Sequence, residues 1–384
     1  MTMHIQSTMK KYILPILGLA ALVACSKTEP VYEESGEIRF APVTSLATKA
    51  QVYNAIDGED YPATEWFNVT AYWKNEIAGK HFTEGTVTYF SNRTFKKGTT
   101  YWAGDPAAYW PKNGSLRFAC YSPSDVPNVS HVLATDTYTV TDYVQSNNTK
   151  ETVDLMVAPT PGSYNAETGA EKVSVVFEHA LSWISFKVVS DDKAKDIFTI
   201  KKIVVNDVNT KGTLTAVMTA TNDVAKSKTW ELSAITEEEE KNPYVMPYYV
   251  YNNAKGVVAT TTSGGDSKNP VYIEDVTGGT VVIPQPTTSV TITFDQKAEG
   301  SAVLQNQVIT LPLDLFAQQT QSAVENPDAE EPGSEPERVP LEWEAGKHYI
   351  YTLKFAYEED DQILINPSVE EWIPVPVEPE VDAI

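Results

Sequence analysis

Hydrophobic and polar residues alternate along much of this chain in short runs with a period of two. Four runs show it most plainly, and the apolar residues that share a face in them are Val173, Val175 and Phe177; Ile184, Phe186 and Val188; Val290, Ile292 and Phe294; and Tyr349, Tyr351, Leu353 and Phe355. No stretch beyond the N-terminal apolar run shows the helical spacing i, i+3, i+4, i+7. Short alternating runs broken by Gly, Pro, Asn and Asp are typical of antiparallel β-sandwiches with one buried face. The pattern therefore predicts a mainly β fold.

The candidate strands fall into two sets along the chain. The first set is predicted at 36–50, 67–73, 99–104, 115–123, 136–143, 152–160, 179–189 and 198–208, and the second at 271–276, 280–286, 289–296, 307–313 and 348–355. The acidic stretches at 235–243 and 325–340 are predicted to be solvated loops. A chain of this length is long enough for two domains. We expect an N-terminal β-sandwich domain over residues 50–222 and a C-terminal one over 223–384.

The N-terminus carries the features of an export signal. Lys10 and Lys11 precede thirteen uncharged residues, 12–24, and the chain then turns polar. A membrane-spanning helix needs about 20 apolar residues, so this run has the length of a signal peptide instead. The residues before Cys25 read Leu-Val-Ala and resemble the bacterial lipobox, which predicts signal cleavage between Ala24 and Cys25 and acylation of Cys25. The alternative is a plain signal peptide in which Cys25 is incidental.

Charge and cysteine content exclude several functions. The formal net charge is −23, and removing residues 1–24 takes away two lysines and no acid, which makes it −25. Such an acidic body repels phosphate backbones, so nucleic acid is not an expected partner. Cys120 is the only other cysteine and lies in an apolar run, where a buried, inert thiol is expected.

The sequence contains no recognisable catalytic or metal-binding motif. It lacks a Gly-rich phosphate loop, an HExxH motif and a G-x-S-x-G motif, and its five histidines share no ligand spacing. His179 and His348 border apolar runs, where hydrogen-bonded structural imidazoles are expected. The acidic runs 237–240 and 358–361 lack the alternating ligands and turn glycine of a calcium loop. We expect no enzyme activity and no cofactor.

Aromatic residues leave one binding function open. The chain has 8 Trp, 20 Tyr and 12 Phe. Exposed Trp and Tyr can stack on sugars, and four tryptophans of the N-terminal half are candidates for such a surface: Trp66, Trp73, Trp102 and Trp110. Trp73 and Trp183 fall within strand patterns, which favours their burial. A surface lipoprotein that binds glycans is therefore the alternative function.

Several segments together resemble the fimbrillin family, the subunits of type V pili. They are the lipobox, IRFAPVTSLATKA at 38–50, DLMVAPT at 154–160, VVFEHALSWISFKVV at 175–189, WEAGKHYIYTLKF at 343–355 and VEEW at 369–372. The resemblance implies two tandem transthyretin-like β-sandwich domains and export to the outer membrane, with lipid on Cys25. It also implies a trypsin-like maturation protease, which removes an N-terminal segment with the first strand. A strand from another fimbrial subunit then fills the vacated place, which produces a polymer.

The removal of the first strand can be assigned to particular residues. Ile38 and Phe40 share a face of the predicted first strand, within a pro-segment at 25–49. Lys49 follows this strand, and we expect the protease to cut between Lys49 and Ala50. Arg39 is the alternative cut site, but strand pairing would protect it. A permanent first strand that is never removed is the alternative for the whole segment.

The C-terminal tail is a candidate donor strand. Ile373, Val375 and Val377 alternate with Pro374 and Pro376, so an extended tail has one apolar face. Both prolines remove donors from the same edge, so this strand can pair fully with one neighbour only. The tail is predicted either to enter the next subunit or to cap its own domain.

Overall fold

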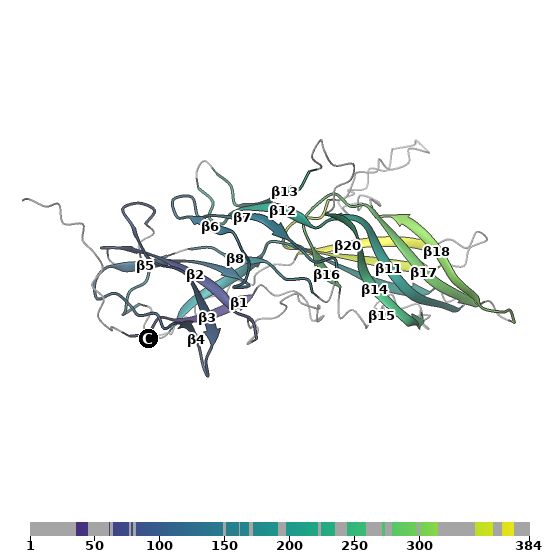
Figure 1. The fold of residues 1–384 in the computed structure, drawn as a ribbon, viewed down its shortest axis with the longest axis horizontal. Helices are drawn as coiled ribbons and strands as arrows, with labels where there is room; N and C mark the ends of the chain where they lie inside the picture. Colours follow the sequence, from purple (N-terminus) through teal and green to yellow (C-terminus); the bar gives the residue numbers. More distant parts are fainter. Residues whose placement is uncertain are drawn as a thin grey trace, which may run out of the picture.

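The alternating runs fold as β-strands throughout the part of the chain that the computed structural model describes. That part comprises residues 36–44, 61, 64–76, 78–79, 82–148, 151–160, 162–168, 172–190, 197–221, 224–234, 244–258, 271–272, 279–297, 300–313, 342–355 and 363–371. These ranges contain twenty strands and no helix, so the predicted mainly β fold is confirmed. The strands form four sheets in an elongated molecule, with the first two sheets toward one end and the last two at the other (Figure 1).

The first sheet closes on itself in the strand order β1-β4-β3-β2-β5-β8-β9. Its members are β1 (Arg39–Thr44), β2 (Phe67–Lys74), β3 (Val87–Lys97), β4 (Trp102–Asp105), β5 (Ser115–Ser122), β8 (Met156–Ala158) and β9 (Val173–His179). All pairings in this sheet are antiparallel except that of β1 with β9, which is parallel.

The second sheet has the order β13-β12-β7-β6 and is antiparallel throughout. Its strands are β6 (Val129–Val132), β7 (Thr137–Val144), β12 (Lys211–Val217) and β13 (Ser227–Leu232). It lies beside the first sheet, near the middle of the molecule (Figure 1).

The third and fourth sheets occupy the opposite end of the molecule from β1 (Figure 1). The third has the order β14-β11-β17-β18, with β11 (Ile197–Asn209), β14 (Val245–Val258), β17 (Ser289–Lys297) and β18 (Leu304–Pro312). The fourth has the order β15-β10-β19-β20, and β16 also pairs with β10; its strands are β10 (Ser182–Ser190), β15 (Val271–Tyr272), β16 (Thr280–Val282), β19 (Lys347–Phe355) and β20 (Ile363–Glu371). Its central pairing, β10 with β19, is parallel over eight residue pairs.

Three hydrophobic clusters form the core of the described part of the chain. One lies within the first sheet, one between the first and second sheets, and one between the third and fourth. β5 separates the first two clusters, and all eight of its residues are buried. Phe118 and Cys120 of this strand point into one cluster, and Ala119 and Tyr121 into the other. The second cluster also contains Trp183 of β10, so it reaches the fourth sheet.

The order of strands along the chain differs from their distribution among the sheets. β10 and β11 come before residue 222 and pair with strands that come after it. β12 and β13 follow β11, yet β12 pairs with β7 of the second sheet. The division of the chain into domains at residue 222 stays a prediction.

Candidate functional site

The first strand and the residue before it, Ile38, place their apolar side chains inside the first sheet. Ile38, Phe40 and Pro42 are buried, whereas Arg39 and Ala41 between them are partly exposed, as a period of two requires. Two residues before Ile38, Gly36 has a φ of +97°, which is strained for other residues. Two backbone hydrogen bonds fix this segment beside the loop before β5, because Ile38 N–H donates to Ala108 (2.7 Å) and Trp110 N–H donates to Gly36 (3.0 Å).

Phe40 lies at the centre of an aromatic cluster. Neither Phe40 nor Ile38 exposes any surface to solvent. The Phe40 ring meets three others edge to face, with centroid distances of 4.8 Å to Phe95, 5.1 Å to Phe118 and 5.8 Å to Phe67. Edge-to-face contacts at these distances are favourable beyond the area that they bury. The first strand is therefore part of the core.

The same strand joins two strands that do not pair with each other. On one edge β1 pairs in parallel with β9, from Phe40 opposite Val173 to Thr44 opposite Phe177. On the other edge it pairs with β4 at only two positions, Arg39 with Ala103 and Phe40 with Trp102. In the strand order of the first sheet β1 is the link that closes the ring between β9 and β4.

Arg39, the alternative cut site, lies inside this strand. Its guanidinium lies 4.1 Å from the centre of the Tyr101 ring, and its Nε is 3.5 Å from a carboxylate oxygen of Glu37. Its backbone is paired with that of Ala103. A protease must bind its substrate in an extended, unpaired form, so pairing shields this residue in the folded chain.

The other predicted sites lie outside the described residues. These are the lipidation and signal-cleavage residues Cys25 and Ala24, the maturation site Lys49 and Ala50, and the tail residues Ile373, Val375 and Val377. They stay predictions, as does the removal of the strand that carries Ile38 and Phe40.

Three of the four tryptophans considered for glycan stacking are buried and therefore not available to a sugar. Trp73, Trp102 and Trp110 expose 2%, 2% and 1% of their surface, and Trp183 is also buried. Trp66 exposes 46% and has the Lys96 ammonium 4.2 Å from its ring centre. One exposed indole that already contacts a cation is a small platform for sugar binding.

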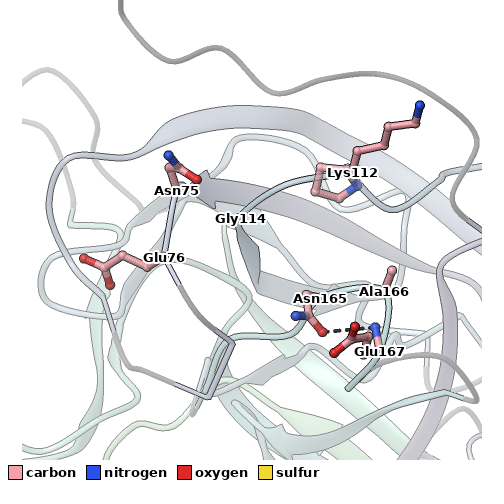
Figure 2. Close-up of a pocket in the computed structure, with 8 residues that line it drawn as sticks. Asn75, Glu76, Lys112, Gly114, Asn165, Ala166 and Glu167 are labelled. Atoms are coloured by element: carbon pink, nitrogen blue, oxygen red, sulfur yellow. Dashed lines mark hydrogen bonds between the residues drawn. The ribbon is translucent and has the colours of Figure 1, made fainter.

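A surface pocket of about 570 Å³ lies near the end of β2, and Figure 2 shows the residues around it. Its lining consists of Asn75, Glu76, Pro111, Lys112, Gly114, Asn165, Ala166 and Glu167. None of these residues is aromatic, so the pocket offers no stacking surface to a sugar. Two of its polar groups act within the fold, because the Asn165 side-chain oxygen accepts from the Glu167 amide (3.0 Å) and Glu76 pairs with Lys74 (2.7 Å).

The histidines singled out in the sequence have structural roles, as predicted. His179 Nδ1 lies 2.9 Å from a carboxylate oxygen of Asp154, and both side chains are buried. His348 stacks on Trp183 at 3.5 Å, and its Nε2 lies 2.8 Å from the Ser185 hydroxyl. Burial lowers the pKa of His348 to about 3, with a smaller contribution from the charge of Lys187, so this imidazole is neutral at physiological pH.

Cys120 is a buried thiol, as predicted. It exposes 2% of its surface, and burial raises its pKa well above the ordinary value. A protonated, inaccessible thiol does not act as a nucleophile. Within the ranges that the structure covers, no group of three or more His, Cys, Asp or Glu residues could hold a metal ion.

One buried charged cluster was not predicted from the sequence. The Arg117 guanidinium donates to the backbone oxygens of Phe82 and Thr160, both at 2.5 Å, and to the Thr160 hydroxyl. Burial by itself raises the pKa of Asp136, but hydrogen bonds with His131, Thr219 and Thr160 lower it to about 2. The cluster joins the first sheet, through Arg117 of β5, to the second sheet, through Asp136 beside β7. Arg117 stands between Leu116 and Phe118 in a largely apolar strand, and such a position is a sequence signal of a buried, hydrogen-bonded charge.

No helix among the described residues has the length and apolar character needed to cross a membrane.

Comparison with protein-family models agrees with the resemblance seen in the sequence. The family model described as fimbrillin-like matches residues 55–372. A fimbrial protein of Bacteroides vulgatus is structurally similar, with a TM-score of 0.49 and 14% identity over 87% of this chain and 99% of that one. The tip fimbrial protein Mfa3 of Porphyromonas gingivalis, with C-terminal truncation, has a TM-score of 0.33 and 9% identity over 87% of this chain and 100% of that one. No curated protein matches the chain. Because the family model covers most of its length, this chain belongs to the fimbrillin-like family.

Proposed function

We propose that this chain is the lipid-anchored precursor of a structural fimbrial subunit, which loses its first strand before it polymerises. Membership of the fimbrillin-like family supports a structural subunit of a cell-surface fimbria and a non-enzymatic role. The observation that carries the rest of the proposal is the position of β1, which closes the ring between β9 and β4 and contributes Phe40 to the core.

Removal of β1 would leave a defect that another strand can repair. The side chains of Ile38 and Phe40 would leave the core, and the rings of Phe67, Phe95 and Phe118 would lose their shared partner. The facing edges of β9 and β4 would lose their backbone partners. An incoming strand with apolar side chains at alternate positions restores both the packing and the hydrogen bonds. Assembly is thereby coupled to completion of the fold.

The proposed cut lies between Lys49 and Ala50 and is made by a trypsin-like protease. Arg39 is the alternative cut site, and its pairing with Ala103 inside β1 favours Lys49. Before the cut, lipid on Cys25 would hold the precursor at the outer membrane. The segment 25–49 would then carry β1 away with it.

The neighbouring subunit would supply the replacement strand. The apolar face of Ile373, Val375 and Val377 makes residues 373–384 one candidate. The other possibility is that this tail caps its own C-terminal domain, and both stay open.

Substitution at the cut site tests the proposal. Lys49→Ala should leave a folded, lipidated precursor that does not polymerise and still contains residues 37–44, whereas Lys49→Arg, which keeps the basic residue that the protease needs, should polymerise. Ladders of high molecular weight on gels of unheated cell extracts report polymer, and N-terminal sequencing reports the cut.

Two results would correct different parts of the proposal. If Lys49→Ala forms ladders from chains cut elsewhere, Lys49 is the wrong scissile residue. If it forms ladders from chains that retain β1, subunits do not assemble through the place of this strand.

A further inference from the structure

Among the described residues, β18, one of the two outer strands of the third sheet, has an unpaired backbone edge. β18 pairs with β17 over its length, and no other strand among the described residues pairs with its second edge. Free strand edges pair readily with other chains, and proteins protect them with charged side chains, internal prolines or very short strands.

The other edge strands of the described sheets carry this protection. β13 contains Lys228 and Glu231, and β14 contains Pro247 and Lys255. β20 contains Pro367 and two glutamates, and β6, β15 and β16 have only 4, 2 and 3 residues. β18 has nine residues, LQNQVITLP, without a charge, and its single proline is its last residue.

Two apolar side chains of this uncharged strand are largely exposed. Val308 exposes 63% of its surface and Leu304 exposes 55%. Thr310 and Pro312 share the face of Val308 and are also exposed, whereas Ile309 and Leu311 pack partly against the core. The chain as a whole has a net charge of −23, so two copies repel each other over most of their surfaces. An uncharged edge is a place where a second copy can approach.

Backbone geometry defines the register that such a contact would take. The Leu313 amide donates to the Thr288 carbonyl at 2.9 Å, toward the β17 side. Amides alternate between the two edges, so the N–H and C=O groups of Val308 and Thr310 point to the free edge. The regular part ends at Asn306, whose φ of +53° marks a bulge, and at Pro312, which has no N–H. A two-fold pairing centred on Ile309 fits between these limits.

This register is complementary to itself. It places Val308 of each copy opposite Thr310 of the other, so that both residues use their outward N–H and C=O groups. Ile309 lies opposite Ile309 on the core side. β18 has no charged side chain, so the contact brings no like charges together. At the three central positions, 308–310, a β-branched residue faces a β-branched residue, which favours strand pairing.

We propose that β18 pairs antiparallel with β18 of a second copy of this chain. The contact is symmetric and closes with two chains, so it does not propagate as a head-to-tail contact does. It lies at the opposite end of the molecule from β1 (Figure 1). It therefore does not depend on removal of β1, and a precursor can form it.

Substitution of Thr310 by proline or valine isolates the backbone contribution. Both changes remove the 2.9 Å contact between the hydroxyls of Thr310 and Thr291. Thr310→Pro also removes the outward N–H, whereas Thr310→Val keeps it. All proteins are full-length chains that carry Cys25→Ala, which prevents association through lipid. We expect sedimentation equilibrium to show a dimer for the parent and for Thr310→Val. Thr310→Pro should dimerise at least about tenfold more weakly, with an unchanged circular dichroism spectrum.

Disulfide cross-linking tests the register. A mixture of Val308→Cys and Thr310→Cys chains should form a disulfide-linked dimer on mild oxidation, because these positions face each other about 5.5 Å apart. Each variant alone should cross-link much less, since the like residues then stand on a diagonal. Val144→Cys mixed with Thr310→Cys is the control, because Val144 is 55% exposed on β7, a strand paired on both edges. The resident Cys120 is buried and does not interfere.

The proposal is overturned if the parent chain remains monomeric at all concentrations. Equal affinities of the proline and valine variants overturn it as well, as does equal cross-linking in the control mixture. Because β1 stays in place in these chains, none of these results bears on strand removal at the other end.

Discussion

Truncation of Phe40 in the uncut precursor should destabilise the N-terminal part of the protein by about 3–5 kcal/mol. The side chain exposes no surface and touches three aromatic rings within 6 Å, so Phe40→Ala leaves a cavity surrounded by Phe67, Phe95 and Phe118. For a unit of 150–250 residues, each kcal/mol lowers the melting temperature by about 2–4 °C, which gives a decrease of roughly 6–20 °C.

A neighbouring residue in the same strand provides the control. Arg39→Ala removes a partly exposed side chain that contacts Glu37 and Tyr101. Surface interactions of this kind contribute about 0–1 kcal/mol, so the free energy of unfolding should change little. Neither substitution alters the backbone pairing of β1.

Urea unfolding followed by tryptophan fluorescence measures both effects. Trp102 and Trp110 lie in the same cluster as Phe40, so their emission reports loss of this core. If the two variants lose the same small amount of stability, the first strand is not packed in the core. A strand that contributes so little could be removed without creating a need for replacement.

Three further results are expected. Cys25→Ala should abolish incorporation of a palmitate analogue in metabolic labelling, and persistent label would show that the lipobox assignment is wrong. Deletion of 373–384 should abolish polymer without changing the melting temperature if the tail enters a neighbour, whereas a large loss of monomer stability would show that it caps its own domain. The third concerns His348, whose pKa in the folded chain is lowered to about 3. Below pH 6.5 the unfolded chain takes up a proton that the folded chain does not, so stability falls by about 1.4 kcal/mol per pH unit toward pH 3. Urea titrations at pH 7 and pH 5 should show a smaller loss for His348→Gln, and an equal loss in both proteins would contradict the assignment.

Faces of strands could be predicted from the sequence, but their partners could not. Alternation correctly placed Ile38 and Phe40 together, because it follows from the strand geometry of the residues themselves. The pairing of β1 with β9 joins residues more than a hundred positions apart, and no local pattern specifies it. No local pattern in the sequence predicts the parallel direction of this pair either.

Burial of polar residues also depends on distant parts of the chain. Ser185 belongs to the polar face of its alternating run, yet it exposes only 1% of its surface. Its hydroxyl meets His348, 163 positions away, which satisfies its hydrogen bond in the interior. The buried Trp73 also satisfies its polar group through a distant residue, since its indole N–H donates to the Asn113 carbonyl at 2.7 Å.

The interleaved path of the chain has a mechanical consequence. The backbone passes from the first and second sheets to the third and fourth, or back, between β9 and β10, between β11 and β12, and between β13 and β14. A tensile force that pulls the two ends of the molecule apart is therefore carried by covalent backbone as well as by side-chain packing. The connections from β9 to β10 and from β11 to β12 are only two residues and one residue long, so they bear the load before the twelve-residue connection from β13 to β14 does.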